Sequence, residues 1–138
     1  MITIQHEGFP APGKKLRAVV RKAASRIGLP GKATVRLAGA DEVRALNRKY
    51  RGQDRATDVL SFPLGETLAD GPYAGDILVC LPVAEKQARR SGHSLEKELL
   101  LLVIHGLLHL KGFDHETDEG EMLALQKRLY AEFGAELP

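Results

Sequence analysis

Three absences limit what this chain of 138 residues can be. Tryptophan is missing and aromatic residues make up only 5% of the chain, so the core must be built from aliphatic side chains. A single cysteine excludes an internal disulfide bond. The N-terminus has no basic region followed by an apolar stretch, so we expect no secretory signal. The length predicts one domain, residues 1–138, with a modest but sufficient core.

Long hydrophobic runs are also scarce. One apolar run, Leu99–Leu110, holds ten aliphatic residues or glycines and two histidines. It is too short to cross a bilayer, which takes about 20 apolar residues. We therefore expect no membrane association and take a cytoplasmic location as the default. The lone cysteine, Cys80, lies in the apolar segment 77–81 and is expected in the core.

The formal net charge of +2 hides an uneven distribution. Residues 1–60 hold 13 Lys or Arg and 5 Asp or Glu, whereas residues 61–138 hold 7 and 13. A basic first half suits a polyanionic partner such as a nucleic acid. A solvated charged surface is an equally good interpretation of the charge alone.

Hydrophobic periodicity predicts alternating strands and helices. Strands are expected at Ile2–Gln5, Thr34–Ala38, Val59–Phe62 and Ile77–Leu81, with a loop over Leu64–Gly75. Helices are expected over 16–27, from an N-cap at Asp41, over 82–90, from an N-cap at Ser94 through the apolar run, and from Thr117–Asp118 onward. Inward positions include Val43, Leu46 and Tyr50 in the second helix and Met122, Leu125, Leu129 and Phe133 in the last.

The order of these elements predicts an α+β (mixed α/β) fold in a single small domain. Early strands separated by helices pair in parallel, and the two later strands pair antiparallel. The expected result is a roughly four-stranded mixed sheet packed with about five helices. The apolar helix lies at the centre of this arrangement.

Three of the five histidines fall within eleven residues, at His105, His109 and His115. The first two are one turn apart on one face of the apolar helix. Gly112 follows where a left-handed residue lets the chain reverse, so that His115 can return toward them. Buried imidazoles without partners cost about 1–3 kcal/mol each, and a shared divalent ion removes that cost. The spacing predicts a metal site on the central buried helix, with a fourth zinc position open as in catalytic zinc.

Other interpretations of the motif stay open at this point. The histidines could be ordinary core or surface residues, or they could hold a sealed structural zinc with a fourth ligand such as a carboxylate. The spacing also matches the metzincin pattern H-E-x-x-H-x-x-G-x-x-H, except that Gly106 replaces the glutamate that acts as general base. Glu98, about 10 Å away along the helix, is too far to replace it. Asp114 could act as a base or contact a ligand, and turn formation is its equal alternative.

Several segments together resemble a known family, the YbeY endoribonucleases, which are bacterial rRNA maturation factors. The segment 105–115, H-G-L-L-H-L-K-G-F-D-H, is similar to the family signature. The segment 46–63, which includes T-D-V-L-S-F-P, is similar as well, as are G-D-I at 75–77 and S-G-H-S at 91–94. The resemblance extends over nearly the whole chain, in order and in length.

The resemblance implies a zinc-dependent, single-strand-specific endoribonuclease, a hydrolase of phosphodiester bonds. Its expected role is the maturation of the 3′ end of 16S rRNA and late ribosome quality control. It implies His105, His109 and His115 as ligands of one Zn²⁺ and Arg51 as a catalytic residue. Expected partners are single-stranded RNA, especially rRNA, and the ribosome or its small subunit.

Basic residues precede the strand expected at 59–62. They are Arg48, Lys49, Arg51 and Arg55. If this strip borders the metal, it can hold the backbone of an extended RNA strand with little sequence selectivity. Arginine also suits bidentate contact with phosphate, although Arg51 could instead be a structural partner of Asp54 or Asp58. The scarcity of aromatics argues against extensive base stacking.

Two other functions compete with a ribonuclease. One is a metallopeptidase or another metal hydrolase, against which the glycine at position 106 counts. The other is a ribosome assembly factor without enzymatic activity, whose zinc is structural.

Overall fold

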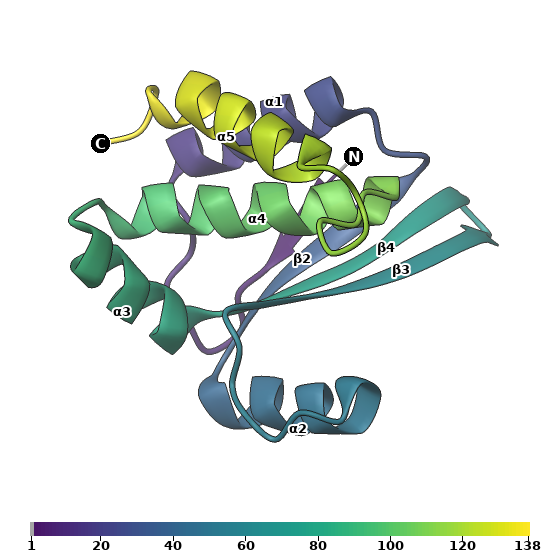
Figure 1. The fold of residues 1–138 in the computed structure, drawn as a ribbon, viewed down its shortest axis with the longest axis horizontal. Helices are drawn as coiled ribbons and strands as arrows, with labels where there is room; N and C mark the ends of the chain where they lie inside the picture. The colour runs from purple at the N-terminus through teal and green to yellow at the C-terminus, as the bar shows by residue number, and fades with distance from the viewer. Residues whose placement is uncertain (1) are drawn as a thin grey trace.

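The computed structural model describes residues 2–138, which form four strands and five helices (Figure 1). The strands are β1 (Ile2–Gln5), β2 (Lys32–Ala38), β3 (Val59–Leu68) and β4 (Gly71–Cys80). The helices are α1 (Lys14–Ile27), α2 (Ala40–Arg51), α3 (Leu81–Ser91), α4 (Leu95–Lys111) and α5 (Glu121–Gly134). The strands form one sheet in the order β1-β2-β4-β3. β1, β2 and β4 pair in parallel, and β3 pairs antiparallel with β4, so the expected α+β fold is confirmed.

The helices cover the two faces of the sheet unequally (Figure 1). α1, α4 and α5 lie on one side, and α2 lies alone on the other. α4 packs against β3 and β4 and also contacts α1, α3 and α5. It is therefore the central helix, as the sequence predicts.

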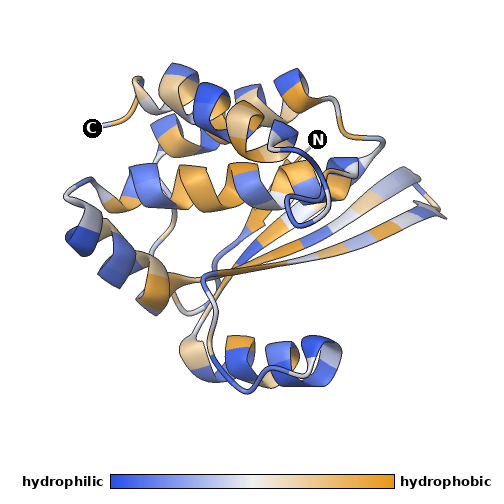
Figure 2. Ribbon diagram, in the orientation of Figure 1, coloured by the Kyte–Doolittle hydropathy of each residue, from blue (hydrophilic) through white to orange (hydrophobic). Residues whose placement is uncertain are grey.

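α4 is held in place mainly by burial of its apolar side chains. Leu100, Ile104, Leu107 and Leu108 are fully buried in the main core. Each such side chain contributes about 1.5–3 kcal/mol on burial. Figure 2 shows the contrast between the largely hydrophobic α4 and the largely hydrophilic α2. The predicted N-cap is confirmed, because the hydroxyl of Ser94 accepts a hydrogen bond from the first turn.

A smaller core lies between α2 and the opposite face of the sheet. Its buried residues are Ala38, Val43, Leu60, Leu78 and Cys80. The cysteine is fully buried, which confirms its expected place in the core. Burial raises the pKa of its thiol above the usual value, so it is poorly suited to act as a nucleophile.

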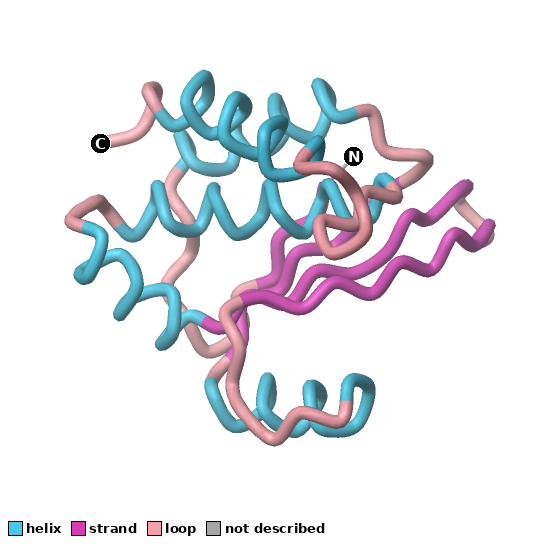
Figure 3. Tube along the Cα trace, viewed as in Figure 1, coloured by secondary structure: helices cyan, strands magenta, loops and turns pink. Residues whose placement is uncertain are grey.

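The segment expected to be a loop, residues 64–75, is mostly strand. β3 and β4 are ten residues each and form a long hairpin, with a register shift between Pro63 and Glu66 (Figure 3). The side chains of residues 63–70 are exposed. Because neither face of this part of β3 is buried, the sequence shows no alternation of apolar and polar residues there.

The start of α2 also differs from the prediction. The N-cap is Gly39, and Asp41 lies within the first turn. There its negative charge still interacts favourably with the positive end of the helix dipole. Tyr50 was expected to face inward, but it is 58% exposed. It lies on the last turn of α2, where its ring contacts Phe62 at the margin of the second core.

α5 begins later than predicted, at Glu121 rather than at Thr117–Asp118. The carboxylate of Asp118 accepts hydrogen bonds from the backbone N–H groups of Gly120 and Met122. Asp118 therefore satisfies amide groups at the start of the helix without being part of it. This side-chain capping before an irregular turn explains why the sequence predicts the start of α5 too early in the chain.

Candidate metal centre

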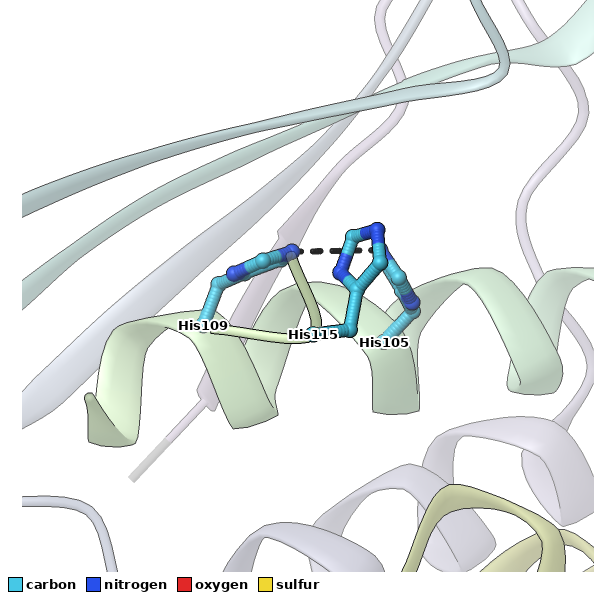
Figure 4. A group of neighbouring side chains, drawn as sticks. All are labelled: His105, His109 and His115. Atoms are coloured by element: carbon cyan, nitrogen blue, oxygen red, sulfur yellow. Dashed lines mark hydrogen bonds between the residues drawn. The ribbon is translucent and has the colours of Figure 1, made fainter. Parts of the chain in front are cut away.

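Three imidazole rings meet beside the C-terminal half of α4 (Figure 4). His105 and His109 belong to the helix, one turn apart, and His115 belongs to the loop that follows it. One ring nitrogen from each residue lies within 4.8 Å of the other two. The structure thus brings together the three side chains that the sequence motif singles out.

Gly112 makes the chain reverse after α4. Its φ of 114° lies in the left-handed region, which glycine adopts at little cost. The backbone N–H of Gly112 bonds to the carbonyl of His109, and that of Phe113 bonds to the carbonyl of Leu108. These bonds close the helix end and turn the next residues back along it. His115 reaches the helical histidines for this reason.

Two of the rings are oriented by hydrogen bonds at Nδ1, the nitrogen that faces away from the other histidines. Nδ1 of His109 lies 3.0 Å from the carbonyl oxygen of Phe113. A carbonyl only accepts, so Nδ1 carries the proton and Nε2 of the neutral ring carries a lone pair. Nδ1 of His105 lies 2.7 Å from Oε1 of Gln126, which favours the same tautomer. Both Nε2 atoms are then acceptors.

The inner nitrogens are placed to share a cation. The Nε2 atoms of His105 and His109 are 3.2 Å apart, along the dashed line in Figure 4. With their outer nitrogens protonated, neither ring has a hydrogen to donate to the other. Nδ1 of His115 is buried and has no hydrogen-bond partner within residues 2–138. Neutral imidazoles with lone pairs directed at one point suit a divalent ion, so this cluster can bind a metal.

Burial lowers the pKa of His109 below its usual value, and the neighbouring His105 acts in the same direction. The hydrogen bond to the carbonyl of Phe113 and the charge of Asp114 oppose this shift without cancelling it. The neutral ring, the form that binds a metal, therefore persists to a lower pH than in an exposed histidine.

A cleft of about 540 Å³ opens onto the histidines. It is lined by the end of α2, the segment from there to β3, and the loop after α4. Besides the histidines, its charged lining residues are Arg51, Arg55, Asp58, Asp114 and Glu116. Two guanidinium groups face three carboxylates, so the sign of the local charge depends on whether a metal ion is bound.

Arg51, the last residue of α2, is exposed and lines this cleft. Its two alternative partners are engaged elsewhere. Asp54 pairs with Arg44 at 2.7 Å, and Asp58 accepts a hydrogen bond from Gln87. No carboxylate in the described part of the chain forms an ion pair with Arg51. Its guanidinium is therefore open to an anionic ligand in the cleft.

The fold divides the other residues of the predicted basic strip. Arg55 lines the cleft, whereas Arg48 and Lys49 line a separate hollow on the outer face of α2. Nζ of Lys49 lies 5.1 Å from the centroid of the Tyr50 ring. Among the four basic residues, therefore, only Arg51 and Arg55 line the cleft that contains the three histidines.

Asp114 lines the cleft next to the third histidine, and its side chain is exposed. Its carboxylate accepts a hydrogen bond from the backbone N–H of Glu116, and its carbonyl accepts bonds from Thr117 and Asp118. These contacts are the turn chemistry that the sequence leaves open. A catalytic role for Asp114 stays a prediction.

Sequence reasoning missed the groups that orient the ligands. Gln126 lies 21 residues from His105 on a different helix, so no local spacing points to it. The carbonyl of Phe113 carries no side-chain signal at all. Asn47 was missed too, although it is 1% exposed and its amide donates to the carbonyl of Arg55, which holds the cleft wall. The sequence feature that points to Asn47 is a polar residue among the inward-facing positions of α2.

Gly106 lies where α4 crosses β4. A Cβ atom at this position would lie 2.8 Å from Cγ2 of Ile77, which is itself buried. The glycine therefore permits close packing of the helix on the sheet. This finding gives a structural reason for the residue that separates the motif from the protease pattern.

The family model described as Endoribonuclease YbeY matches residues 6–134, nearly the whole chain. The chain belongs to the YbeY endoribonuclease family. The Endoribonuclease YbeY of Koribacter versatilis is 45% identical to it over 129 residues, which cover 94% of this chain and 82% of the relative. That of Geobacillus thermodenitrificans is 42% identical over 132 residues, covering 86% and 85%.

A solved structure agrees with the fold of this YbeY family member. The solution structure of TM1509 from Thermotoga maritima superposes with a TM-score of 0.66 at 38% identity. The superposition covers 99% of this chain and 91% of the other. Among residues 2–138, no helix is long and apolar enough to span a membrane.

Proposed function

We propose that this chain is a zinc-dependent endoribonuclease that cleaves single-stranded RNA in the cleft beside α4. The main support is the convergence of His105, His109 and His115, which line that cleft. Membership of the YbeY family supports the class of reaction. Three imidazoles leave a fourth tetrahedral position for substrate or water, as in catalytic zinc sites.

Each part of the cleft has a role in this proposal. A bound divalent ion supplies a Lewis acid for a phosphoryl oxygen and lowers the pKa of water at the site. Arg51 contacts the same phosphate and neutralises charge that develops on it. Gln126 and the carbonyl of Phe113 keep His105 and His109 in the tautomer that presents Nε2 inward. Arg55 contacts the backbone of the strand.

The natural substrate that we propose is ribosomal RNA, with the 3′ end of 16S rRNA in the small subunit as the site of action. Late ribosome quality control, in the cytoplasm, is part of the same proposal. A cleft lined by two arginines, Arg51 and Arg55, fits a strand held by its backbone. This fits selection by single-strandedness and location rather than by sequence.

A metallopeptidase is a weaker alternative. A protease of this plan needs a glutamate at position 106. Ile77 occupies the space that any side chain there would need. A ribosome assembly factor with structural zinc is the other alternative. The open cleft over the histidines argues against it.

The proposal is tested with purified protein, stripped of metal and then reloaded with one equivalent of zinc. The substrate is a labelled single-stranded fragment from the 3′ region of 16S rRNA, with the duplex form as a comparison. We expect cleavage only after reloading, and none by His109→Ala. We expect Arg51→Ala to lower kcat/KM about 10²–10³-fold.

Arg48→Ala is the matched control, because it removes a nearby positive charge outside the cleft. Cleavage that survives both metal removal and His109→Ala would contradict the proposal. The chemical groups at the ends of the RNA products show which nucleophile attacks the phosphate. A 2′,3′-cyclic phosphate indicates attack by the RNA's own hydroxyl, and a simple phosphate with a free hydroxyl indicates attack by water.

A further inference from the structure

Tyr50 is an exposed aromatic ring one residue before Arg51. It is 58% exposed, and its ring makes an edge-to-face contact with that of Phe62, with centroids 5.5 Å apart and an interplanar angle of 72°. Single exposed apolar side chains are ordinary on protein surfaces. What distinguishes Tyr50 is its position between two hollows, next to the arginine that lines the cleft.

The second hollow lies under the sheet, on the side of α2. It is a groove of about 500 Å³ whose lining includes the aromatic rings of Tyr50, Phe62 and Tyr73. The metal cleft and this groove meet at two pairs of consecutive residues. Arg51 and Pro63 line the cleft, whereas Tyr50 and Phe62 line the groove.

This division follows from the geometry of the elements. Consecutive helical residues point about 100° apart, and consecutive strand residues point to opposite faces. β3 is the edge strand of the sheet, so no further strand separates the hollows on its outer side. A chain lying in the cleft can therefore pass over this edge and reach the ring of Tyr50.

The cations nearest to the ring, Lys49 and Arg51, suit a nucleic acid. Nζ of Lys49 lies 5.1 Å from the ring centroid, so a surface cation is the group found over the ring. The charged lining residues of the groove are Arg36 and Asp76. The carboxylate of Asp76 accepts a hydrogen bond from Tyr73, and Arg36 pairs with Glu42 at 2.6 Å.

We infer that Tyr50 is a stacking platform for one base of the RNA, next to the phosphate held by Arg51. This inference rests on the proposed function and adds a base subsite to it. An aromatic face stacks on any base, so the subsite selects an unpaired nucleotide and not a sequence. A base paired in a duplex has no face free for such stacking, which gives a physical source of preference for single strands.

The absence of tryptophan from the natural chain makes a direct experiment possible. Tyr50→Trp introduces a single tryptophan at the proposed subsite, and its fluorescence can be excited apart from that of the remaining tyrosines. Leu123→Trp is the matched control, because Leu123 is 48% exposed on α5 and lines neither hollow. Zinc-loaded protein is titrated with a short single-stranded RNA whose intactness is checked on a gel.

We expect RNA to quench the tryptophan at position 50 and to leave that at position 123 unchanged. We expect Tyr50→Ala to weaken RNA binding about 5- to 100-fold and Tyr50→Phe to retain it. An abasic nucleotide moved along the RNA should weaken binding by wild type at one position. At that position it should have no further effect on Tyr50→Ala.

Two results would overturn the inference in different ways. If RNA binds wild type and Tyr50→Ala equally, or leaves the tryptophan at position 50 unquenched, the base subsite is wrong while the proposed function stands. If wild type does not bind single-stranded RNA at all, the proposed function fails and the subsite fails with it. Circular dichroism of each variant confirms that it is folded.

Discussion

Gly106 and Ile77 fix the distance between the metal helix and the sheet, because a Cβ atom on the glycine would lie 2.8 Å from Cγ2 of the isoleucine. Ile77 is fully buried, so it cannot move aside into solvent. The absence of a side chain at this position therefore lets α4, with its two histidines, lie close to the sheet.

Gly106→Ala should destabilise the protein by about 1–3 kcal/mol, although alanine favours a helix over glycine by about 1 kcal/mol. Gly134→Ala is the matched control. A Cβ there would meet the ring of Tyr130 at 3.4 Å, an ordinary contact, so the substitution should be neutral or stabilising. Urea unfolding measures both. Equal stability of Gly106→Ala and wild type would contradict the packing argument.

Gln126 should contribute to metal affinity although it does not touch the metal. Its Oε1 lies 2.7 Å from Nδ1 of His105 and keeps Nε2 free for ligation. Gln126→Leu should weaken zinc binding about 10- to 100-fold, and Gln126→Glu should retain or strengthen it. Competition with a chromophoric chelator measures the affinity. Identical affinities in the leucine and wild-type proteins would show that the hydrogen bond between Gln126 and His105 has no effect on zinc binding.

His93 should stabilise the protein through a buried carboxylate. Glu98 is 4% exposed, and its Oε1 lies 2.6 Å from Nε2 of His93, whose other nitrogen is 3.3 Å from the hydroxyl of Tyr130. His93→Ala leaves the carboxylate buried without this partner and should cost about 1–3 kcal/mol or more. Tyr130→Phe removes only the contact between the tyrosine hydroxyl and His93 and should cost about 1 kcal/mol. The reverse order of the two losses would contradict this account.

The metal-stripped protein should lose stability as the pH falls below about 6.5, the usual pKa of histidine. Burial lowers the pKa of His109 in the folded state, so below this pH the unfolded chain binds a proton that the folded chain does not. Above pH 6.5 both states are neutral and the effect vanishes. In His109→Gln the free energy of unfolding should vary less over this range, and an unchanged pH profile would refute the assignment.

Features encoded by neighbouring residues were predictable. The histidine spacing, the reversal at Gly112 and the cap at Ser94 each depend on contacts within one or two turns of the chain. The parallel order of the early strands follows from the helices between them, so the fold class was predictable too. Local sequence was sufficient because these features need no distant partner.

Features that depend on distant contacts were not predictable. The bond between His105 and Gln126 joins two helices, and the exposure of Tyr50 depends on its packing against Phe62 of a distant strand. The long hairpin was missed because the outer part of β3 is exposed on both faces and shows no hydrophobic period. In each case, the deciding interaction lies outside the local window of sequence.

The most direct test of the central claim is an X-ray absorption spectrum of the protein loaded with one equivalent of zinc. The account predicts three imidazole nitrogens and one further light atom at about 2.0–2.1 Å, with one imidazole lost in His115→Ala. The absence of tight zinc binding, or a shell of four protein ligands with no exchangeable position, would contradict it.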